Sequence, residues 1–103
     1  MKKEPYLRNE NPDEIREVLY LEVKNLRNLS NNEDLKEIKI NLENIIQRTD
    51  QKNLIELIEK GLENLDNDKI KSSIHYLNMA LRMLGHKFTE EEDIQNSTFI
   101  DNE

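Results

Sequence analysis

Apolar residues recur along most of the chain at intervals of three and four positions, the spacing of one face of an α-helix. Four stretches between residues 11 and 86 show this pattern, and no stretch alternates apolar and polar positions as a strand does. The sequence therefore predicts an all-α fold. The residues predicted to face inward are, stretch by stretch, Ile15, Val18, Leu19, Val23, Leu26 and Leu29; Leu35, Ile38, Leu42, Ile45 and Ile46; Leu54, Ile58, Gly61, Leu62 and Leu65; and Ile74, Leu77, Leu81 and Leu84.

Residues typical of helix starts precede the first two stretches. Asn11 can cap a helix, Pro12 suits the first helical position, and the acidic residues that follow favour the positive end of the helix dipole. Ser30 and Glu33 have the spacing of a capping box, in which each residue satisfies a backbone N–H at the helix start. We therefore expect one helix to follow each of these segments.

The segments RTDQKN and LDNDK supply the next two breaks. Thr49 or Asp50 can cap the third helix, and Asp66 or Asn67 can cap the fourth. One continuous helix through RTDQKN is the alternative. Gly85 is placed to adopt the left-handed conformation that ends the fourth helix, because glycine has no Cβ to oppose it.

Four amphipathic helices with short connections predict antiparallel neighbours, and hence a small four-helix bundle made of two helical hairpins. We assign this domain to residues 11–86, with flexible ends on both sides. Residues 1–10 are predicted to form an N-terminal arm, and residues 87–103 an acidic polar C-terminal tail. Within the tail, Thr89 can cap one further short helix.

Gly61 lies on the apolar face of the third helix, where glycine costs roughly 1 kcal/mol relative to alanine. Ser73 and Ala80 are small residues on the inward side of the fourth helix, so we expect the two backbones to approach closely. A glycine without a packing role is the alternative. The spacing of Gly61, Ser73, Leu77 and Ala80 resembles one tetratricopeptide-type helical hairpin, which implies hairpin geometry for this pair.

The chain carries few residues that could support catalysis or bind a metal ion. It has no cysteine, which excludes disulfides and thiolate metal sites. His75 and His86 lie too far apart on one helix to share a metal ion, and neither belongs to a Glu-x-x-His motif. The sequence contains no phosphate loop, dinucleotide fingerprint or nucleophile–base pair. We therefore expect no catalytic residue, no metal and no cofactor, and a protein that is not an enzyme.

The net charge is −7, and an acidic surface repels phosphate, which disfavours nucleic acid as a partner. No apolar run reaches the roughly 18 residues of a membrane span. The two lysines near the N-terminus are not followed by the apolar segment of a signal peptide. A cytoplasmic protein that does not bind membranes is the default expectation.

The fourth helix has more apolar residues than one buried face needs. Tyr76, Met79 and Met83 form a second stripe away from its main face, and methionine repacks easily against different surfaces. Tyr20 and Leu21 likewise lie off the core stripe of the first helix. We predict these five residues as the partner-binding surface.

Three hypotheses for the second stripe stay open. The ends of the chain could cover it, through Tyr6 and Leu7 or through Phe88 and Phe99. Alternatively, it mediates self-association, as in a homodimer, or it binds a different protein.

The predicted function is a non-enzymatic protein–protein interaction module. It would be a small regulator, inhibitor or immunity-type protein that binds a protein partner or self-associates. The segment HKFTEEEDI resembles the late region of bacteriocin immunity proteins, which are similar in size and bundle architecture. The further long C-terminal helix of that family has no counterpart here, so none of its residues is transferred.

The alternative function is a dimeric, nucleic-acid-associated helical protein. Its contacts would come from basic residues around the first helix turn, although acidic residues interleave with them. The residues concerned are Lys24, Arg27, Lys36 and Lys39.

Overall fold

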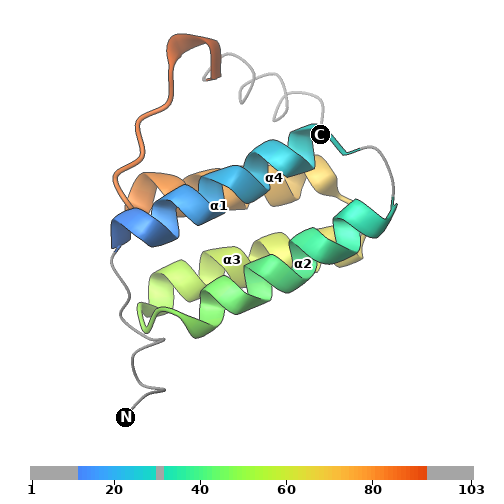
Figure 1. Cartoon of the computed structure of the whole chain (residues 1–103), viewed down its shortest axis with the longest axis horizontal. Coiled ribbons are helices and arrows are strands. Elements are labelled where there is room, and N and C mark those ends of the chain that lie inside the picture. The colour runs from blue at the N-terminus through green and yellow to red at the C-terminus, as the bar shows by residue number, and fades with distance from the viewer. Residues whose placement is uncertain (1–11, 30–31, 93–103) are drawn as a thin grey trace.

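The computed structural model describes residues 12–29 and 32–92 of the 103-residue chain. It contains four long helices, α1 (Pro12–Arg27), α2 (Asn32–Gln47), α3 (Lys52–Asp66) and α4 (Ile70–Met83) (Figure 1). The predicted all-α bundle of four main helices is therefore confirmed. The N-terminal arm, the proposed caps Asn11 and Ser30, and the end of the tail lie outside the described residues.

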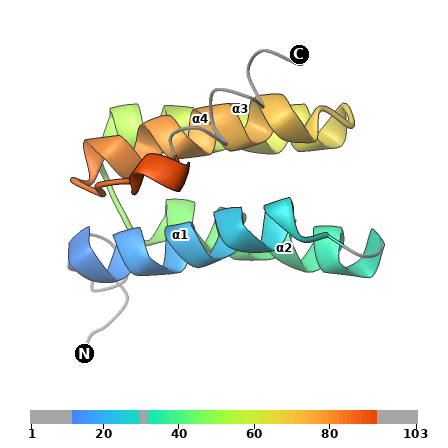
Figure 2. The same ribbon diagram turned by 90° about the horizontal axis from the view of Figure 1, so that it is seen from above.

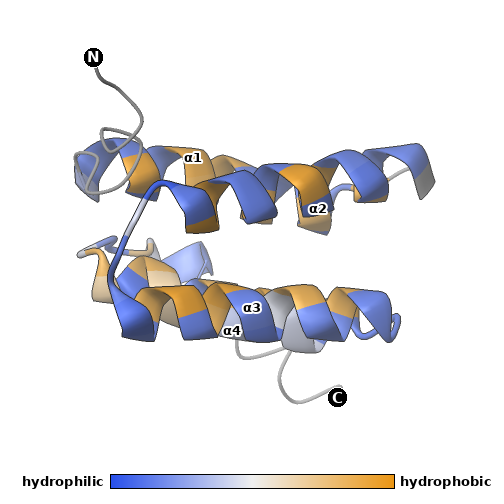
Figure 3. Ribbon diagram, turned by 90° about the horizontal axis from the view of Figure 1, so that it is seen from below, coloured by the Kyte–Doolittle hydropathy of each residue, from blue (hydrophilic) through white to orange (hydrophobic). Residues whose placement is uncertain are grey.

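The four helices form two layers, one made of α1 and α2 and the other of α3 and α4 (Figure 2). In addition to its hairpin partner, α1 packs against α4 and α2 packs against α3. The apolar sides of both hairpins face the space between the layers (Figure 3). The core therefore forms where the two amphipathic hairpins meet, as their stripes require.

Every residue predicted to face inward is buried or partly buried. Leu19, Leu42, Ile58 and Leu77, one from each helix, have no exposed surface. Burying a leucine or isoleucine side chain contributes about 1.5–3 kcal/mol, so these stripes supply the main stabilisation of the fold. The partly buried members stand at the edges of the stripes, namely Val18, Leu29, Leu35, Ile46, Leu62 and Leu84.

The break between α2 and α3 is confirmed, but the residue that caps α3 is not the one predicted. Gln51 occupies the cap position and makes no side-chain capping bond. Thr49 is almost fully buried, and its hydroxyl accepts a hydrogen bond from the Gln51 N–H at 3.2 Å. Thr49 therefore stabilises the turn before α3 and does not cap the helix. Its side chain is buried against the core.

The prediction that Asp66 or Asn67 caps α4 is wrong. Asp66 is the last residue of α3, and Asn67 caps that helix at its C-terminus. Asp68 then adopts a positive φ of 62°, a conformation that aspartate tolerates better than most residues. Lys69 precedes α4 without a side-chain capping bond. The turn thus depends on the left-handed residue at position 68 and not on a capping carboxylate.

Gly85 ends α4 as predicted, with a φ of 89°. Its N–H donates to the Arg82 carbonyl at 3.0 Å, and the His86 N–H donates to the Leu81 carbonyl at 2.9 Å. These two bonds define a Schellman motif, which satisfies carbonyl groups that the helix end would otherwise leave unpaired.

The close approach of α3 and α4 at Gly61 is also confirmed. A Cβ at this position would lie 2.8 Å from Leu77 Cδ2 and 3.4 Å from Ser73 Oγ. Ser73 and Ala80 have no exposed surface. Gly61 therefore lets a large core side chain of α4 occupy the space that its own side chain would fill.

Candidate functional site

Tyr76, Met79 and Met83 lie on the outer side of α4, and we call them the methionine face. Met79 is 39% exposed and Met83 46% exposed, whereas Tyr76 is partly buried. Lys60 of α3 places its Nζ 5.7 Å from the centre of the Tyr76 ring. The three residues thus form an exposed apolar surface on the α3–α4 hairpin, next to a basic side chain.

The described part of the C-terminal segment is directed elsewhere. Phe88 packs against the core and lies edge-on to His86, with ring centres 4.6 Å apart. The guanidinium of Arg82 lies 5.0 Å from the Phe88 ring. Both methionines keep a large exposed area in the presence of this segment. Tyr6, Leu7 and Phe99, the other residues suggested as a cover, lie outside the described residues.

Leu21 is 53% exposed but belongs to the other layer of the bundle. It lies on the side of α1 opposite the buried residues Leu19 and Val23. Ile40 is similarly exposed on α2, two positions from the buried Ile38 and Leu42. The structure therefore does not bring Leu21 together with the methionine face.

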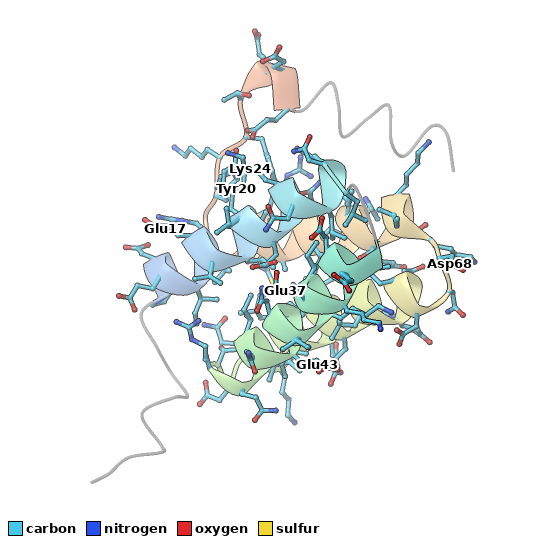
Figure 4. The ribbon with its side chains drawn as sticks, turned by 45° about the vertical axis from the view of Figure 1, so that its right-hand side comes forward. Glu17, Tyr20, Lys24, Glu37, Glu43 and Asp68 are labelled. Atoms are coloured by element: carbon cyan, nitrogen blue, oxygen red, sulfur yellow. The ribbon has the colours of Figure 1, made fainter. Side chains whose placement is uncertain are left out.

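Tyr20 contacts the segment that follows α4. Its hydroxyl donates a hydrogen bond to the Glu92 carboxylate, and its ring centre lies 4.5 Å from that of His86. The hydrogen bond to Glu92 raises the pKa of Tyr20, and the same bond lowers the pKa of Glu92. Figure 4 shows Tyr20 and Lys24 extending from α1 toward this segment. Sequence analysis missed this contact, which joins residues 72 positions apart.

Thr89 and Glu92 form the predicted cap of a short helix. The Thr89 N–H donates to Glu92 at 2.9 Å, and the Glu92 N–H donates to the Thr89 hydroxyl at 3.1 Å. This reciprocal pair is a capping box. Because Glu92 also accepts from Tyr20, the cap anchors the segment to α1.

Lys39 and Lys24, both proposed to contact nucleic acid, make contacts within the molecule. Lys39 Nζ lies 2.9 Å from an oxygen of Asp66, which connects α2 to α3. Lys24 Nζ lies 5.5 Å from the centre of the Tyr20 ring. These contacts give no support to a continuous basic patch around the first turn.

A polar groove of about 250 Å³ lies between α1 and α2, and sequence analysis did not predict it. Its lining combines carboxylates and amides around one apolar residue. The lining residues are Glu22, Asn25 and Asn28 on the α1 side, and Asp34, Glu37, Ile38 and Asn41 on α2.

Glu22 is the most deeply placed polar residue of this groove. It is only 4% exposed, and its Oε2 accepts a hydrogen bond from Asn41 Nδ2 at 3.1 Å. Its other oxygen, Oε1, is buried and has no hydrogen-bond partner among the described residues. Burial raises the pKa of the Glu22 carboxyl, hydrogen bonding to the side chains of Asn41 and Asn25 opposes that shift, and the charge of Glu37 adds to it.

The sequence does hold a signal for Glu22. Position 22 follows Leu19 by three and precedes Leu26 by four, so it lies on the inward stripe of α1. An ionisable residue at such a position is costly to bury unless it is paired. A charged residue inside an apolar stripe is therefore the sequence feature that distinguishes Glu22.

Other chemistry is not found in the described part of the chain. No group of three histidine, cysteine, aspartate or glutamate side chains there could hold a metal ion. None of the helices between residues 12 and 92 is long and apolar enough to cross a membrane.

The fold and the two surfaces define a small four-helix bundle that has an apolar face on one layer and an acidic groove on the other. Comparisons with models of protein families, with curated proteins and with solved structures found no match. The local resemblances to a tetratricopeptide-type hairpin and to immunity proteins thus gain no support from them.

Proposed function

We propose that this chain is a non-enzymatic interaction module that binds either a different protein or a second copy of itself. The methionine face is the proposed docking surface. The observation that carries the proposal is that Met79 and Met83 stay exposed beside Tyr76 on a fully packed hairpin.

The side chains of the methionine face and the rigid packing beneath them support this role. Methionine side chains are flexible and polarisable, so they adapt to a partner at low cost, and tyrosine adds contact area with a polar tip. The close contact of α3 and α4 at Gly61 holds the helix that carries these residues firmly in place. A preorganised surface loses less conformational freedom on binding than a mobile one.

The test is the solution mass of the chain, measured by light scattering over a wide concentration range. The Met79→Glu, Met83→Glu double variant should keep its helix content, by circular dichroism, and lose association. The matched control is Leu21→Glu with Ile40→Glu, which changes two exposed apolar residues on the other layer. It should associate like the unmodified chain.

Each result bears on a different part of the proposal. Loss of helix in the methionine variant would show that Met79 and Met83 are core residues and would overturn the docking surface. If the chain is monomeric at all concentrations, the self-association hypothesis is wrong, and binding to a different protein is then the remaining form of the proposal. Tight, salt-sensitive binding to random-sequence duplex DNA would overturn the module and favour the nucleic-acid alternative.

A further inference from the structure

We propose that the groove between α1 and α2 binds a guanidinium group, presented by an arginine side chain of a partner protein. The inference rests on the proposed function only in assigning the arginine to a partner. The groove is separate from the methionine face, since it opens between helices of the other layer.

The carboxylate of Glu22, at the base of the groove, has one unsatisfied oxygen. Glu22 is almost fully buried, and Oε1 lacks a hydrogen-bond partner among the described residues. A buried carboxylate oxygen that lacks a donor is costly even when the other oxygen is hydrogen-bonded, so Oε1 needs an explanation other than stability. A positively charged ligand would supply the missing donors.

Two of the amides that line the groove each donate a hydrogen bond within the chain. Asn41 donates its Nδ2 to Glu22 at 3.1 Å, and Asn28 donates its Nδ2 to the Lys24 carbonyl at 2.9 Å. The oxygens of both amides remain as acceptors. The groove therefore combines carboxylate and amide acceptors, which suit a ligand rich in N–H donors.

The lining of the groove is acidic. Three carboxylates, from Glu22, Asp34 and Glu37, line the groove, and none of its lining residues in the described part of the chain is basic. Figure 4 shows Glu37 between the ribbons of α1 and α2, whereas Glu17 lies on the side of α1 away from α2. The net charge of −7 adds to the attraction for a cation.

A guanidinium fits this lining better than the other cations. It carries five N–H donors in a fixed plane and is weakly hydrated, whereas an ammonium is a compact, strongly hydrated charge with three donors. No group of three ligating side chains in the described residues suits a metal ion. The volume of about 250 Å³ is below the usual range for small-molecule pockets, so it suits a side chain better.

The experiment is an NMR titration of the full chain with Nα-acetyl-arginine amide. The matched control ligand is Nα-acetyl-citrulline amide, which has nearly the same shape but no charge. We expect saturable shifts in the millimolar range, concentrated on the side-chain amide signals of Asn25, Asn28 and Asn41. Citrulline should produce little change.

Two variants identify the group responsible. Glu22→Gln should weaken arginine binding by about tenfold or more, since it removes a charge-assisted hydrogen bond. Glu17→Gln removes the same charge from an exposed position of the same helix and should change affinity by less than about twofold. Circular dichroism checks that both variants keep their helices.

Several results would overturn the proposal: no saturable shift, equal shifts with citrulline, or equal losses in the two variants. Failure here is distinguishable from failure of the docking surface. The Met79→Glu, Met83→Glu variant should bind acetyl-arginine amide like the unmodified chain, and Glu22→Gln should leave self-association unchanged. If acetyl-arginine amide does not bind and the methionine variant still loses association, only the proposed guanidinium site in the groove is wrong.

Discussion

The two hairpins of this bundle pair their helices in different ways. In the α3–α4 hairpin, Gly61 and Ser73 are small, and Leu77 fills the space between the backbones. In the α1–α2 hairpin, Glu22 and Asn41 meet across the interface through a hydrogen bond of 3.1 Å, and a groove remains beside them.

This difference bears on what each interface can do. Small residues allow apolar side chains to interlock, which removes surface from water and leaves no room for a ligand. A carboxylate and amides at a helix interface hold it open, because their polar atoms need partners. We therefore expect substitutions at the contact between α3 and α4, at Gly61 and Leu77, to act mainly on folding, and substitutions at Glu22 to act mainly on the proposed binding in the groove.

The largest effect is expected for Leu77→Ala. Leu77 has no exposed surface and contacts Gly61, so truncating it leaves a cavity in the closely packed hairpin. Such changes lower the free energy of unfolding by about 2–5 kcal/mol. Urea denaturation followed by circular dichroism measures this loss.

Ile40→Ala, at a residue that is 55% exposed, serves as the control and should cost about 0.5 kcal/mol or less. Equal stability of the two variants would show that the core face of α4 is misassigned.

Gly61→Ala should have the next largest effect, and it sets two forces against each other. Alanine favours the helix by about 1 kcal/mol. Its methyl group would lie 2.8 Å from Leu77 Cδ2, and overpacking a core costs about 1–3 kcal/mol. We expect a net loss of up to about 2 kcal/mol in the unmodified chain.

The sign of the Gly61→Ala effect should reverse when Leu77 is alanine. The crowding is then relieved, and the gain in helix propensity of about 1 kcal/mol remains. A double-mutant cycle with urea denaturation measures the coupling. If Gly61→Ala has the same effect in both backgrounds, the close contact between α3 and α4 does not limit their packing.

Much of this fold follows from local pattern. The stripes of Leu19, Leu42, Ile58 and Leu77 follow the helical period, so the buried face of each helix is predictable without knowing the neighbours. The roles of Gly61 and Gly85 are predictable for a related reason, since an interior glycine and a glycine after a helix each have few structural explanations.

The turn residues and the polar contacts depend on tertiary structure instead. Asp66 has a good capping side chain, but it pairs with Lys39 of α2 and belongs to the end of α3. Tyr20 meets Glu92 only because α1 and the segment after α4 lie together. Glu22 becomes recognisable as part of a groove only when α2 places Asn41 beside it. The spacing of apolar residues within one helix does not predict these contacts between different segments.

The smallest effect on stability is expected for Glu22→Gln, which changes the polar interface between α1 and α2. Because burial raises the pKa of Glu22, the folded chain binds its proton more tightly than the unfolded chain does. The stabilisation from this proton is complete at pH values below the unfolded pKa. It is lost as the pH rises through the folded pKa, so at neutral pH the unmodified chain carries the cost of a buried charge.

Glutamine has no such charge, so Glu22→Gln should be more stable than the unmodified chain at pH 7, by about 1 kcal/mol. The advantage should shrink as the pH falls through the raised pKa of Glu22, because the folded chain then takes up the proton. Asp34 and Glu37 face the same groove and are present in both chains, so the difference between the two isolates position 22. Urea denaturation at several pH values measures the difference in stability, with Glu17→Gln as the control.

A Glu22→Gln variant that is less stable at pH 7 would mean that the carboxylate stabilises the α1–α2 interface. A gain in stability together with a loss of arginine binding would show that the chain retains a buried charge for recognition at the expense of stability.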